Sequence, residues 1–340
     1  MPGPSRRSFL DACWSKPVER TPVWFMRQAG RSLPEYRRLR ERHGMFEIIR
    51  NPELAAEVTM QPVRRLGVDA AILFSDIVVP LAAVGVEIEL APGPVLAQPF
   101  RYPDDLRRLR PLEPDADLPY VADTVRILSQ ELDVPLIGFA GGPFTLATYL
   151  VEGGPSKDHA RTKALMWSEP ATWARLLDQL AGIVVASLRA QVAAGATAVQ
   201  IFDSWAGILS RDDYLRHVLP ATQRVFSGLA DLGVPRIHFG VGTGELLDLM
   251  AQAGADVVGV DWRVSLDRAR ARVGPDVAVQ GNLDPAACLA PWPVLAERVA
   301  AVLAANGDQP GHVFNLGWGV LPTTDPDVLR RVVDLVHAEG

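Results

Sequence analysis

Two arginines at the end of a short apolar run are the residues of this sequence that most directly suggest chemistry. Arg27 directly follows the apolar residues Val23–Met26, and Arg31 follows four positions later with Gly30 before it. Two guanidinium groups held side by side repel each other unless an anion lies between them. Each presents a planar fork of donors that fits a carboxylate or a phosphate with two hydrogen bonds. The pattern predicts a site for a polyanionic small molecule, which Gly30 allows to approach the backbone closely.

The composition offers a simpler explanation for most of the other arginines. Only three of the 34 basic residues are lysines, so arginine is the ordinary surface cation of this chain. Residues 20–50 contain eight arginines and three glutamates, a net charge of +5, which leaves −11 for the rest of a chain whose total is −6. A solvated basic helix over residues 37–42 accounts for much of this charge. Arg27 differs because it ends a buried run, and one basic stretch in an acidic protein favours local capture of an anion.

Asp76 is a second candidate because its surroundings are apolar. It follows Ala71–Ser75 and precedes Ile77–Pro80. A carboxylate in such a run is costly unless it is paired or hydrogen-bonded. A helix cap or an ion pair with Arg27 would be a structural explanation, but both flanks are apolar and no helix is expected at once. We therefore predict a functional role for Asp76.

Other polar residues at predicted strand ends are weaker candidates. Tyrosines such as Tyr149 often bond backbone groups, and a serine at a strand end, such as Ser204, is often a cap. Asp203 and Asp261 are expected to pair with arginines of the barrel, and His238 and His312 to be satisfied core residues. The glycine-rich stretch 240–244 suits a phosphate at a helix start or close packing, and the sequence does not distinguish the two.

The sequence contains no familiar metal or cofactor motif. Cys-x-x-Cys, His-Glu-x-x-His, Gly-x-Ser-x-Gly and the P-loop pattern are absent, and the six histidines have no metal-binding spacing. The two cysteines, Cys13 and Cys288, are too few for a disulfide framework or a thiolate-rich zinc site. We expect a site that works through arginine, aspartate, tyrosine and serine, with no metal and no organic cofactor.

Length and composition predict one soluble domain. The chain has 340 residues, 48% of them hydrophobic, and residues 1–340 are expected to form a single domain with 1–7 as a flexible tail. That tail lacks the apolar core of a secretory signal, and no apolar run approaches the roughly 20 residues of a membrane span. A net charge of −6 argues against nucleic acid and anionic membranes as partners. The cysteine content favours a reducing cytoplasm.

Short apolar runs alternate with stretches of helical periodicity. The eight runs are Val23–Met26, Ala70–Phe74, Leu136–Ala140, Ala198–Phe202, Arg236–Phe239, Val257–Val260, Val277–Gln280 and Val313–Leu316. Asn51-Pro52, Asp284-Pro285 and Asp325-Pro326 are typical of helix starts. Eight strand–helix units predict an α/β fold, a (β/α)₈ TIM-type barrel, whose chemistry gathers at the carboxyl ends of the strands.

A doubly wound sheet is the alternative, but the first strand is not followed by the glycine fingerprint that it would need. One segment interrupts the alternation. Val86–Leu90 and Val95–Phe100, joined by Ala91–Pro94, predict a β-hairpin inserted after the second strand.

Six segments resemble one known family, the uroporphyrinogen decarboxylases. Pro22–Arg31 with the following Ser32–Arg37 resembles their amino-terminal signature, and Gly138–Tyr149 resembles their second signature. Shorter matches follow in the same order at Phe74–Ile77, Gln200–Gly207, Gln280–Pro285 and Phe314–Gly317. The resemblance runs from about residue 6 to the C-terminus, and this number of colinear matches makes it specific.

The resemblance implies a cytoplasmic, cofactor-independent (β/α)₈ homodimer of porphyrin and haem biosynthesis. Its reaction would be that of a carboxy-lyase, which converts uroporphyrinogen III to coproporphyrinogen III by removing four acetate carboxyl groups as CO₂. Asp76 and Arg27 would be catalytic, and Asp76 would contact the pyrrole N–H groups. The remaining substrate contacts would come from Arg27, Gln28, Ala29, Gly30, Arg31, Tyr149 and Ser204.

One position departs from the family pattern. After Asn-Leu-Gly the family has a histidine and then a glycine, whereas this chain has Trp318 and Gly319. An indole cannot carry charge or accept a hydrogen bond, and it is larger than an imidazole. If this position touches the substrate, Trp318 alters binding, ring orientation or isomer preference. The simpler expectation is that Trp318 packs over the macrocycle as an apolar contact.

Two other functions stay open at this point. Corrinoid-dependent methyltransferases share the fold but need a zinc site with thiolate or imidazole ligands. Cys13 precedes the first predicted strand, and Cys288 follows the seventh without a nearby histidine. A non-catalytic tetrapyrrole-binding protein is the second alternative, which Trp318 makes conceivable.

Overall fold

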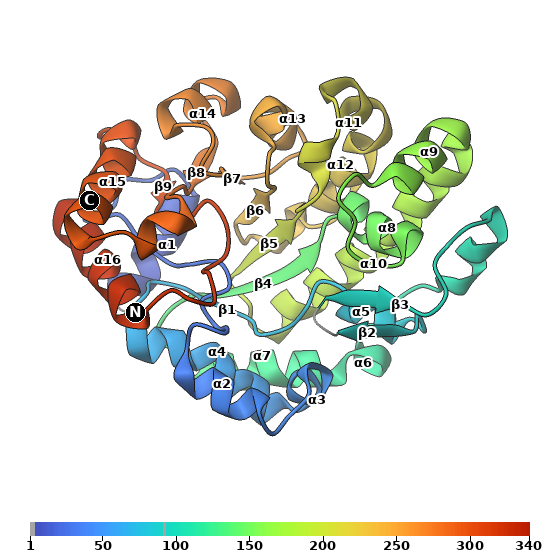
Figure 1. The fold of residues 1–340 in the computed structure, drawn as a ribbon, viewed down its shortest axis with the longest axis horizontal. Coiled ribbons are helices and arrows are strands. Elements are labelled where there is room, and N and C mark those ends of the chain that lie inside the picture. The colour runs from blue at the N-terminus through green and yellow to red at the C-terminus, as the bar shows by residue number, and fades with distance from the viewer. Residues whose placement is uncertain (1–3, 91–92) are drawn as a thin grey trace.

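The computed structural model describes residues 4–90 and 93–340, and its centre is a curled parallel sheet (Figure 1). Within the described residues the sheet has seven strands in the order β1-β4-β5-β6-β7-β8-β9. Its strands are β1 Ala71–Ile72, β4 Leu136–Gly141, β5 Ala198–Phe202, β6 Arg236–Phe239, β7 Val257–Gly259, β8 Ala278–Gln280 and β9 His312–Val313. Seven of the eight predicted runs therefore contain or overlap a strand, and the predicted TIM-type barrel is confirmed.

The first predicted strand closes this sheet into a barrel as an extended segment between β9 and β1. Val23 forms a parallel bridge with Phe314, and the N–H of Phe314 donates to the carbonyl of Pro22 at 2.8 Å. On the other side, the N–H of Asp69 donates to the carbonyl of Val23, also at 2.8 Å. We call Pro22–Met26 the closing segment, because it bonds both edges of the sheet and thereby fills the eighth position.

Helices surround the strands on the outside of the barrel (Figure 1). The α-helices are α1 Pro4–Cys13, α2 Pro34–Arg40, α3 Met45–Arg50, α4 Pro52–Leu66, α5 Val79–Ala83, α6 Pro114–Asp117, α7 Pro119–Glu131, α8 Pro143–Glu152, α9 Ala160–Ser168, α10 Pro170–Ala194, α11 Arg211–His217, α12 Leu219–Ser227, α13 Leu247–Gln252, α14 Leu266–Val273, α15 Trp292–Asn306 and α16 Pro326–Glu339. Short 3₁₀ turns are η1 Pro103–Arg108, η2 Ala206–Ile208, η3 Ala230–Leu232, η4 Gly244–Leu246 and η5 Pro285–Leu289.

The predicted helix starts are confirmed by their caps. The side chain of Asn51 accepts the N–H of Leu54 at the start of α4. Asp284 caps η5 and Asp325 caps α16 in the same way, each with a proline at the first position of the turn or helix. A side-chain acceptor followed by proline satisfies a free backbone donor and removes another, which explains why these dipeptides begin helices.

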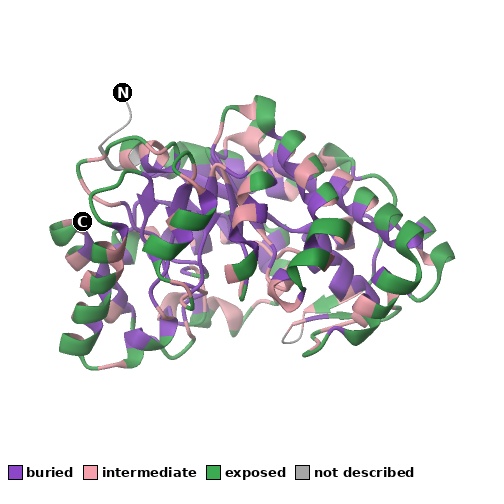
Figure 2. Cartoon of the chain, turned by 90° about the horizontal axis from the view of Figure 1, so that it is seen from above, coloured by how far each residue is buried: buried purple, intermediate pink, exposed green. Residues whose placement is uncertain are grey.

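Strand residues alternate between two layers of apolar packing, and the strands themselves are largely buried (Figure 2). Val199 and Ile201 of β5 pack outward with the helices, whereas Ala198 and Phe202 belong to the cluster that includes the barrel interior. This alternation is the expected period of a barrel strand.

The longest helix, α10, has a length and an apolar content that the sequence prediction overlooked. By length and apolar content α10 is long enough to cross a membrane, although half of its most apolar window is buried inside the structure. It packs against β4 and against α7, α8 and α12. A helix in the covering layer of a barrel is apolar for this reason, and α10 therefore belongs to the fold.

The amino-terminal region is more ordered than predicted. Residues 1–3 of the expected flexible tail lie outside the described residues, but α1 already begins at Pro4, so residues 4–7 are helical. Phe9 of α1 is fully buried, and the helix contacts β8 and β9. Buried apolar side chains of α1 explain why this stretch folds onto the barrel.

The predicted β-hairpin is present after β1 and α5. β2 (Ile88–Leu90) pairs antiparallel with β3 (Pro94–Leu96), while Ala91 and Pro92 of the predicted turn lie outside the described residues. The N–H of Leu96 donates to the carbonyl of Gly153 at the end of α8. The hairpin is therefore attached to the helix that follows β4.

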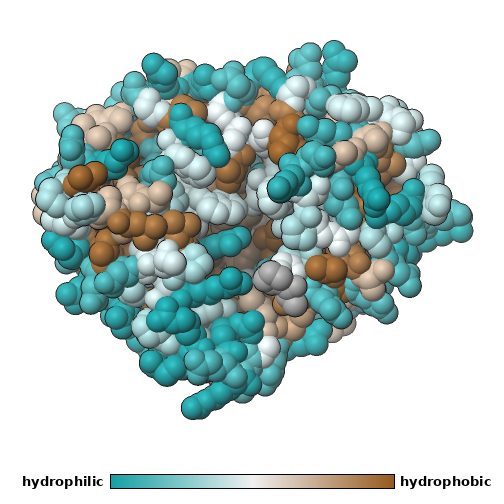
Figure 3. Space-filling model, viewed as in Figure 1, coloured by the Kyte–Doolittle hydropathy of each residue, from teal (hydrophilic) through white to brown (hydrophobic). Residues whose placement is uncertain are grey.

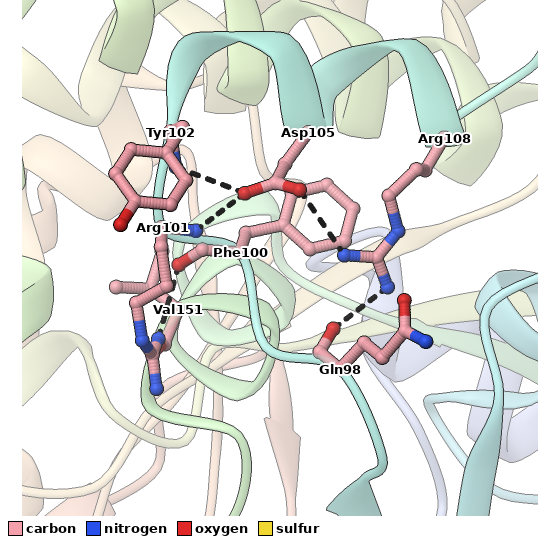
Figure 4. Close-up of polar contacts among 7 residues, drawn as sticks. All are labelled: Gln98, Phe100, Arg101, Tyr102, Asp105, Arg108 and Val151. Carbon is pink, nitrogen blue, oxygen red and sulfur yellow. Dashed lines mark hydrogen bonds and ion pairs between the residues drawn. The ribbon is translucent and has the colours of Figure 1, made fainter.

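The chain that returns from the hairpin is also bound to α8 (Figure 4). Arg101 donates to the carbonyl of Val151, and Asp105 accepts the backbone N–H of Arg101 at 2.7 Å. The guanidinium of Arg108 lies over the ring of Phe100, 4.5 Å from its centroid. These contacts join the rim of the barrel to α8, the helix that carries the predicted site tyrosine.

Asp69 joins the closing segment to the far end of the chain. Its buried carboxylate accepts the N–H of Val23 at 2.8 Å and lies 2.7 Å from Nε2 of His337 in α16. Arg20 donates to its other oxygen at 3.1 Å. One carboxylate thus holds the chain before β1, the closing segment and the last helix together.

We predict that Asp69→Ala lowers the free energy of unfolding by about 1.5–3 kcal/mol, because the buried N–H of Val23 and the half-buried His337 lose a charged hydrogen-bond partner. Chemical denaturation measures this change. The matched control is Asp104→Ala, since Asp104 pairs with Arg107 at a site where both side chains are 82% exposed. Exposed pairs contribute about 1 kcal/mol or less, so equal effects of the two substitutions would contradict the prediction.

Candidate active site

Aromatic rings line the carboxyl ends of three neighbouring strands. Phe139 of β4, Phe202 of β5 and Phe239 of β6 form edge contacts with ring centroids 5.5 Å and 6.1 Å apart along the row. Trp318, in the loop after β9, stacks on Phe239 at 6.0 Å with planes 26° apart. We call these four residues the aromatic row. Phe139 and Phe202 are only partly buried, and their exposed apolar surface suits a large, ring-shaped ligand.

The face of the molecule that carries this row is hollowed. Figure 3, in the view of Figure 1, shows a recess with an apolar floor near the centre of the barrel, bordered by hydrophilic side chains. In a TIM-type barrel the carboxyl ends of the strands hold the functional site. The recess is therefore a candidate for the functional site of the barrel.

Arg27 stands at the end of the closing segment, where its guanidinium carbon lies 5.1 Å from the centroid of the Trp318 ring. Its backbone is in the left-handed region, with φ of 60°. The turn that follows is tight: a Cβ on Gly30 would lie 2.8 Å from the carbonyl oxygen of Arg27. Glycine is required there by this close approach, which turns the chain away after Arg27.

The other residues of the predicted arginine segment have different environments. Gln28 is fully buried, and its amide accepts the N–H of Phe25 and donates to the carbonyl of Ala70, both at 3.0 Å. Its side chain thus serves the barrel and is not free to bind a ligand. Ala29 is half-buried, as is Gly30, and neither backbone N–H meets an acceptor in the described part of the chain. These two donors remain free for an anion.

Arg31 is exposed and points toward the basic helix rather than the aromatic row. Burial raises the pKa of Tyr36 in α2, and the charges of Arg40 and Arg31 oppose this shift. No described contact joins Arg31 to Arg27. The paired clamp that the sequence suggested therefore remains a prediction for Arg31.

Asp76 lies between β1 and α5 and is half-buried. Burial raises the pKa of Asp76, while the N–H of Val78 and the charge of Arg27 act in the opposite direction. One carboxylate oxygen accepts that N–H at 3.0 Å. The short helix α5 begins at Val79, so the expectation that no helix follows at once is wrong, and Asp76 supports its first turn. In the described residues the second oxygen is not hydrogen-bonded.

Tyr149 of α8 joins the same electrostatic group. Burial raises the pKa of Tyr149, and the negative charge of Asp76 raises it further whereas Arg27 opposes this. Its ring makes an edge contact with Trp205 at 6.2 Å. Ser204, the residue before that tryptophan, is half-buried just after β5. The charge of Arg27 thus acts on the pKa of both Asp76 and Tyr149, which places the three side chains near one another.

Asp203 does not pair with an arginine, contrary to the expectation. It is fully buried, accepts a hydrogen bond from the Thr145 hydroxyl at 2.8 Å, and lies 3.8 Å from Nε2 of His238. Both ring nitrogens of His238 lack hydrogen-bond partners among the described residues, so its description as a satisfied core residue is also wrong. Thr145 also accepts the N–H of Trp205, which connects Asp203 to the loop after β5.

Asp261 pairs with an arginine as expected. Its carboxylate also contacts the glycine-rich stretch 240–244, for which the sequence allowed either a phosphate site or close packing. Its carboxylate binds Nη1 of Arg263 at 2.6 Å and accepts the backbone N–H of Gly242. That N–H is therefore occupied by protein. The stretch 240–244 is accounted for by close packing and does not need a phosphate.

Both cysteines are buried within the structure. Burial raises the pKa of Cys288 to about 12, and burial likewise raises the pKa of Cys13 well above the ordinary thiol range. Cys13 lies in α1, and Cys288 lies in η5. Thiols in such surroundings resist ionisation and are poor metal ligands.

Sequence analysis missed the three phenylalanines of the aromatic row and Trp205. Phe202 and Phe239 are the last residues of their strands, and both face inward. Strand alternation combined with the rule that barrel sites lie at carboxyl ends would have identified these two. The sequence pattern predicted polar residues at the strand ends instead, because their chemistry is more specific than that of phenylalanine.

Comparisons with known proteins identify the family of the chain. The model of the family "Uroporphyrinogen decarboxylase (URO-D)" matches residues 4–339. The uroporphyrinogen decarboxylase of Thermobifida fusca is 60% identical over 335 residues, which cover 98% of this chain and 92% of that protein. That of Frankia casuarinae is 61% identical over 332 residues, which cover 97% of this chain and 89% of that protein.

A solved structure is similar in fold alone. The methyltransferase from Methanosarcina mazei superimposes with a TM-score of 0.81, covering 98% of each chain, at 21% sequence identity. At that identity the fold is shared but the chemistry does not follow. The family model and the sequence relatives, in contrast, extend over nearly the whole chain, and the chain belongs to the uroporphyrinogen decarboxylase family.

Proposed function

We propose that this protein decarboxylates uroporphyrinogen III to coproporphyrinogen III, as a carboxy-lyase of porphyrin and haem biosynthesis. The observation that carries this proposal is the convergence of Arg27, Asp76 and Tyr149 beside the aromatic row in a member of this family. The substrate is a large ring that bears eight carboxylates. An apolar floor for the ring and cationic groups for its acidic arms fit such a molecule.

The chemistry requires a temporary positive charge on the ring. A proton added to a pyrrole carbon makes that ring cationic, so it accepts the electron pair released when the bond to the acetate carboxyl breaks. CO₂ leaves, and the ring becomes neutral with an exocyclic methylene group. A second proton added to this methylene carbon gives the methyl group, and the proton first added to the ring carbon is then lost, which restores the pyrrole. Each acetate thus exchanges CO₂ for one proton, and four such steps complete the reaction without an oxidant.

Asp76 is suited to stabilise that charge. Its free carboxylate oxygen lies in a site sheltered from water, where a fixed negative charge acts more strongly than in solution. In the proposed complex this oxygen accepts the pyrrole N–H groups. Tyr149, the backbone N–H groups of Ala29 and Gly30, and Ser204 complete the contacts at the sides of the ring.

Arg27 is proposed to anchor a substrate carboxylate. A guanidinium has a pKa above roughly 12 and hardly releases a proton at neutral pH. A water molecule or a protonated carboxyl group held by Arg27 is a better proton source for the ring. Arg31, at the edge of the same turn, is proposed to bind a further acidic arm.

The methyltransferase alternative is less compatible with the cysteine positions. Activation of a thiol by zinc needs thiolate or imidazole ligands that face the substrate. Both thiols here are buried and resist ionisation. No observation specifically favours the non-catalytic alternative, and the assay below distinguishes it.

We further propose a cytoplasmic homodimer. This assembly is supported by family membership, and the compartment by two buried cysteines that are both unpaired. Light scattering after size-exclusion chromatography would give twice the chain mass of 36.9 kDa if the proposal is correct. A single chain mass at micromolar concentration would contradict it.

The decisive assay is anaerobic incubation with uroporphyrinogen III, followed by chromatographic counting of the carboxyl groups that remain on the product. Stepwise loss to four carboxyl groups supports decarboxylation. Binding of the ring without loss of CO₂ would identify the non-catalytic relative, and failure to bind would exclude both tetrapyrrole functions.

We predict that Asp76→Ala lowers kcat by about 10²–10³, the usual loss when a charge-stabilising group is removed from a transition state. Burial raises the pKa of Asp76, so the ionised form is lost as pH falls through a value above the ordinary aspartate range. The wild-type rate should decline there, and Asp76→Asn should lack this decline. Near-normal turnover by Asp76→Ala would contradict the assigned role.

We predict that Arg27→Lys raises KM more than it lowers kcat, because lysine keeps the positive charge but loses the two-pronged contact with a carboxylate. Steady-state kinetics with uroporphyrinogen III separates the two parameters. A loss confined to kcat, with KM unchanged, would instead assign Arg27 to proton transfer.

A further inference from the structure

The guanidinium of Arg27 is held by an aromatic face and by no acidic side chain. Its central carbon lies 5.1 Å from the centroid of the Trp318 ring. Among the described residues it neither forms an ion pair nor donates a hydrogen bond from its side chain. The charge of Arg27 opposes the rise that burial causes in the pKa of Asp76, but no ion pair or hydrogen bond joins the two side chains in the described residues. Arg27 is thus an exposed arginine at the end of the closing segment whose side-chain donors are unoccupied in the described part of the chain.

This arrangement has a specific physical consequence. A cation–π contact uses the flat face of the guanidinium, whereas carboxylates bind along its edge. A carboxylate partner within the protein would occupy the same N–H groups that a ligand needs. An aromatic partner restricts the rotamers of a long side chain, which is costly in entropy, while it leaves the binding edge free.

Trp318 is itself held in a fixed orientation. Its ring stacks on Phe239, which is fully buried and in edge contact with Phe202. The loop after β9 is also bonded to the closing segment, because the N–H of Val320 donates to the carbonyl of Met26 at 2.9 Å. The backbones that carry Arg27 and Trp318 are therefore linked directly.

The residue after Trp318 makes room for the arginine stem. A Cβ on Gly319 would lie 2.5 Å from Cδ and 2.8 Å from Cγ of Arg27. With glycine there, the stem lies against the loop and its head reaches the indole face. Trp318 and Gly319 together thus define where the guanidinium ends.

We propose that Trp318 is the positioning residue of Arg27: it holds the guanidinium by its face and presents the free edge to a carboxylate arm of the tetrapyrrole. This inference rests on the proposed function for the identity of the ligand. Arg27 is thereby fixed without an acidic side chain that would compete with the carboxylates of the substrate for its N–H donors.

The test compares two substitutions at this position. Trp318→Leu keeps an apolar side chain but removes the aromatic face, and Trp318→Phe keeps a smaller face. Cation–π contacts are worth about two- to thirty-fold in an equilibrium constant. We expect Trp318→Leu to lower kcat/KM and weaken binding of the coproporphyrinogen III product by a factor in this range, mainly through KM, while Trp318→Phe restores most of the loss.

A double-mutant cycle identifies the cause. In an Arg27→Gln background, Trp318→Leu should have little further effect on the Kd for coproporphyrinogen III, because the cation that it positions is gone. The matched control is Trp292→Leu, since Trp292 in α15 holds Arg331 by the same type of contact at 3.8 Å, away from the site. This control should stay within twofold of wild type.

Three results would overturn the proposal. These are an unchanged Kd in Trp318→Leu, an equal loss in the Arg27→Gln background, or a loss in Trp318→Phe as large as in Trp318→Leu. The second would mean that the indole contacts the macrocycle directly. Because Kd is measured as well as turnover, a wild-type protein that binds without releasing CO₂ would refute the proposed function and still test this inference.

Discussion

The site depends on how the barrel is closed. The closing segment Pro22–Met26 bonds β9 on one side and the chain before β1 on the other, so its direction is set by both edges of the sheet. Arg27 follows it immediately, in a left-handed conformation, and is delivered to the carboxyl end of the barrel. Asp69 secures the same segment from below with its buried carboxylate. The same backbone bonds therefore close the sheet and place Arg27, the proposed anchor of a substrate carboxylate.

The site must meet two conflicting requirements, an apolar surface and cations held close to it. In the proposed complex the macrocycle needs an apolar surface, such as the exposed parts of Phe139 and Phe202, whereas its carboxylates need cations that are costly to hold near such a surface. Placing Arg27 at the rim, with its face on Trp318, satisfies both. Asp76 is sheltered enough for its pKa to rise, yet Arg27 and the N–H of Val78 favour its ionised form. The proposed chemistry uses this balance, because the carboxylate must be charged while the ring becomes cationic.

The supporting layer behind the site is also polar. Asp203 is buried beneath the start of α8, and Thr145 connects it to the loop that carries Ser204 and Trp205. Tyr149 lies one turn further along the same helix and touches that tryptophan. The hairpin and its return segment are bonded to the end of α8. The helix α8 thus contacts the loop after β5, carries Tyr149 and binds the hairpin at the rim.

The sequence by itself determined the barrel, the helix caps, the hairpin, and Arg27 and Asp76 as the leading candidates. These features depend on periodicity, capping chemistry and strand ends, which act over a few residues. Only the tertiary structure decided that Gln28 is consumed by the barrel, that His238 lacks partners, and that Trp318 lies against Arg27 from the other end of the chain. Such contacts form when closure of the sheet brings distant strand ends together, and no local pattern records which side chains will then meet.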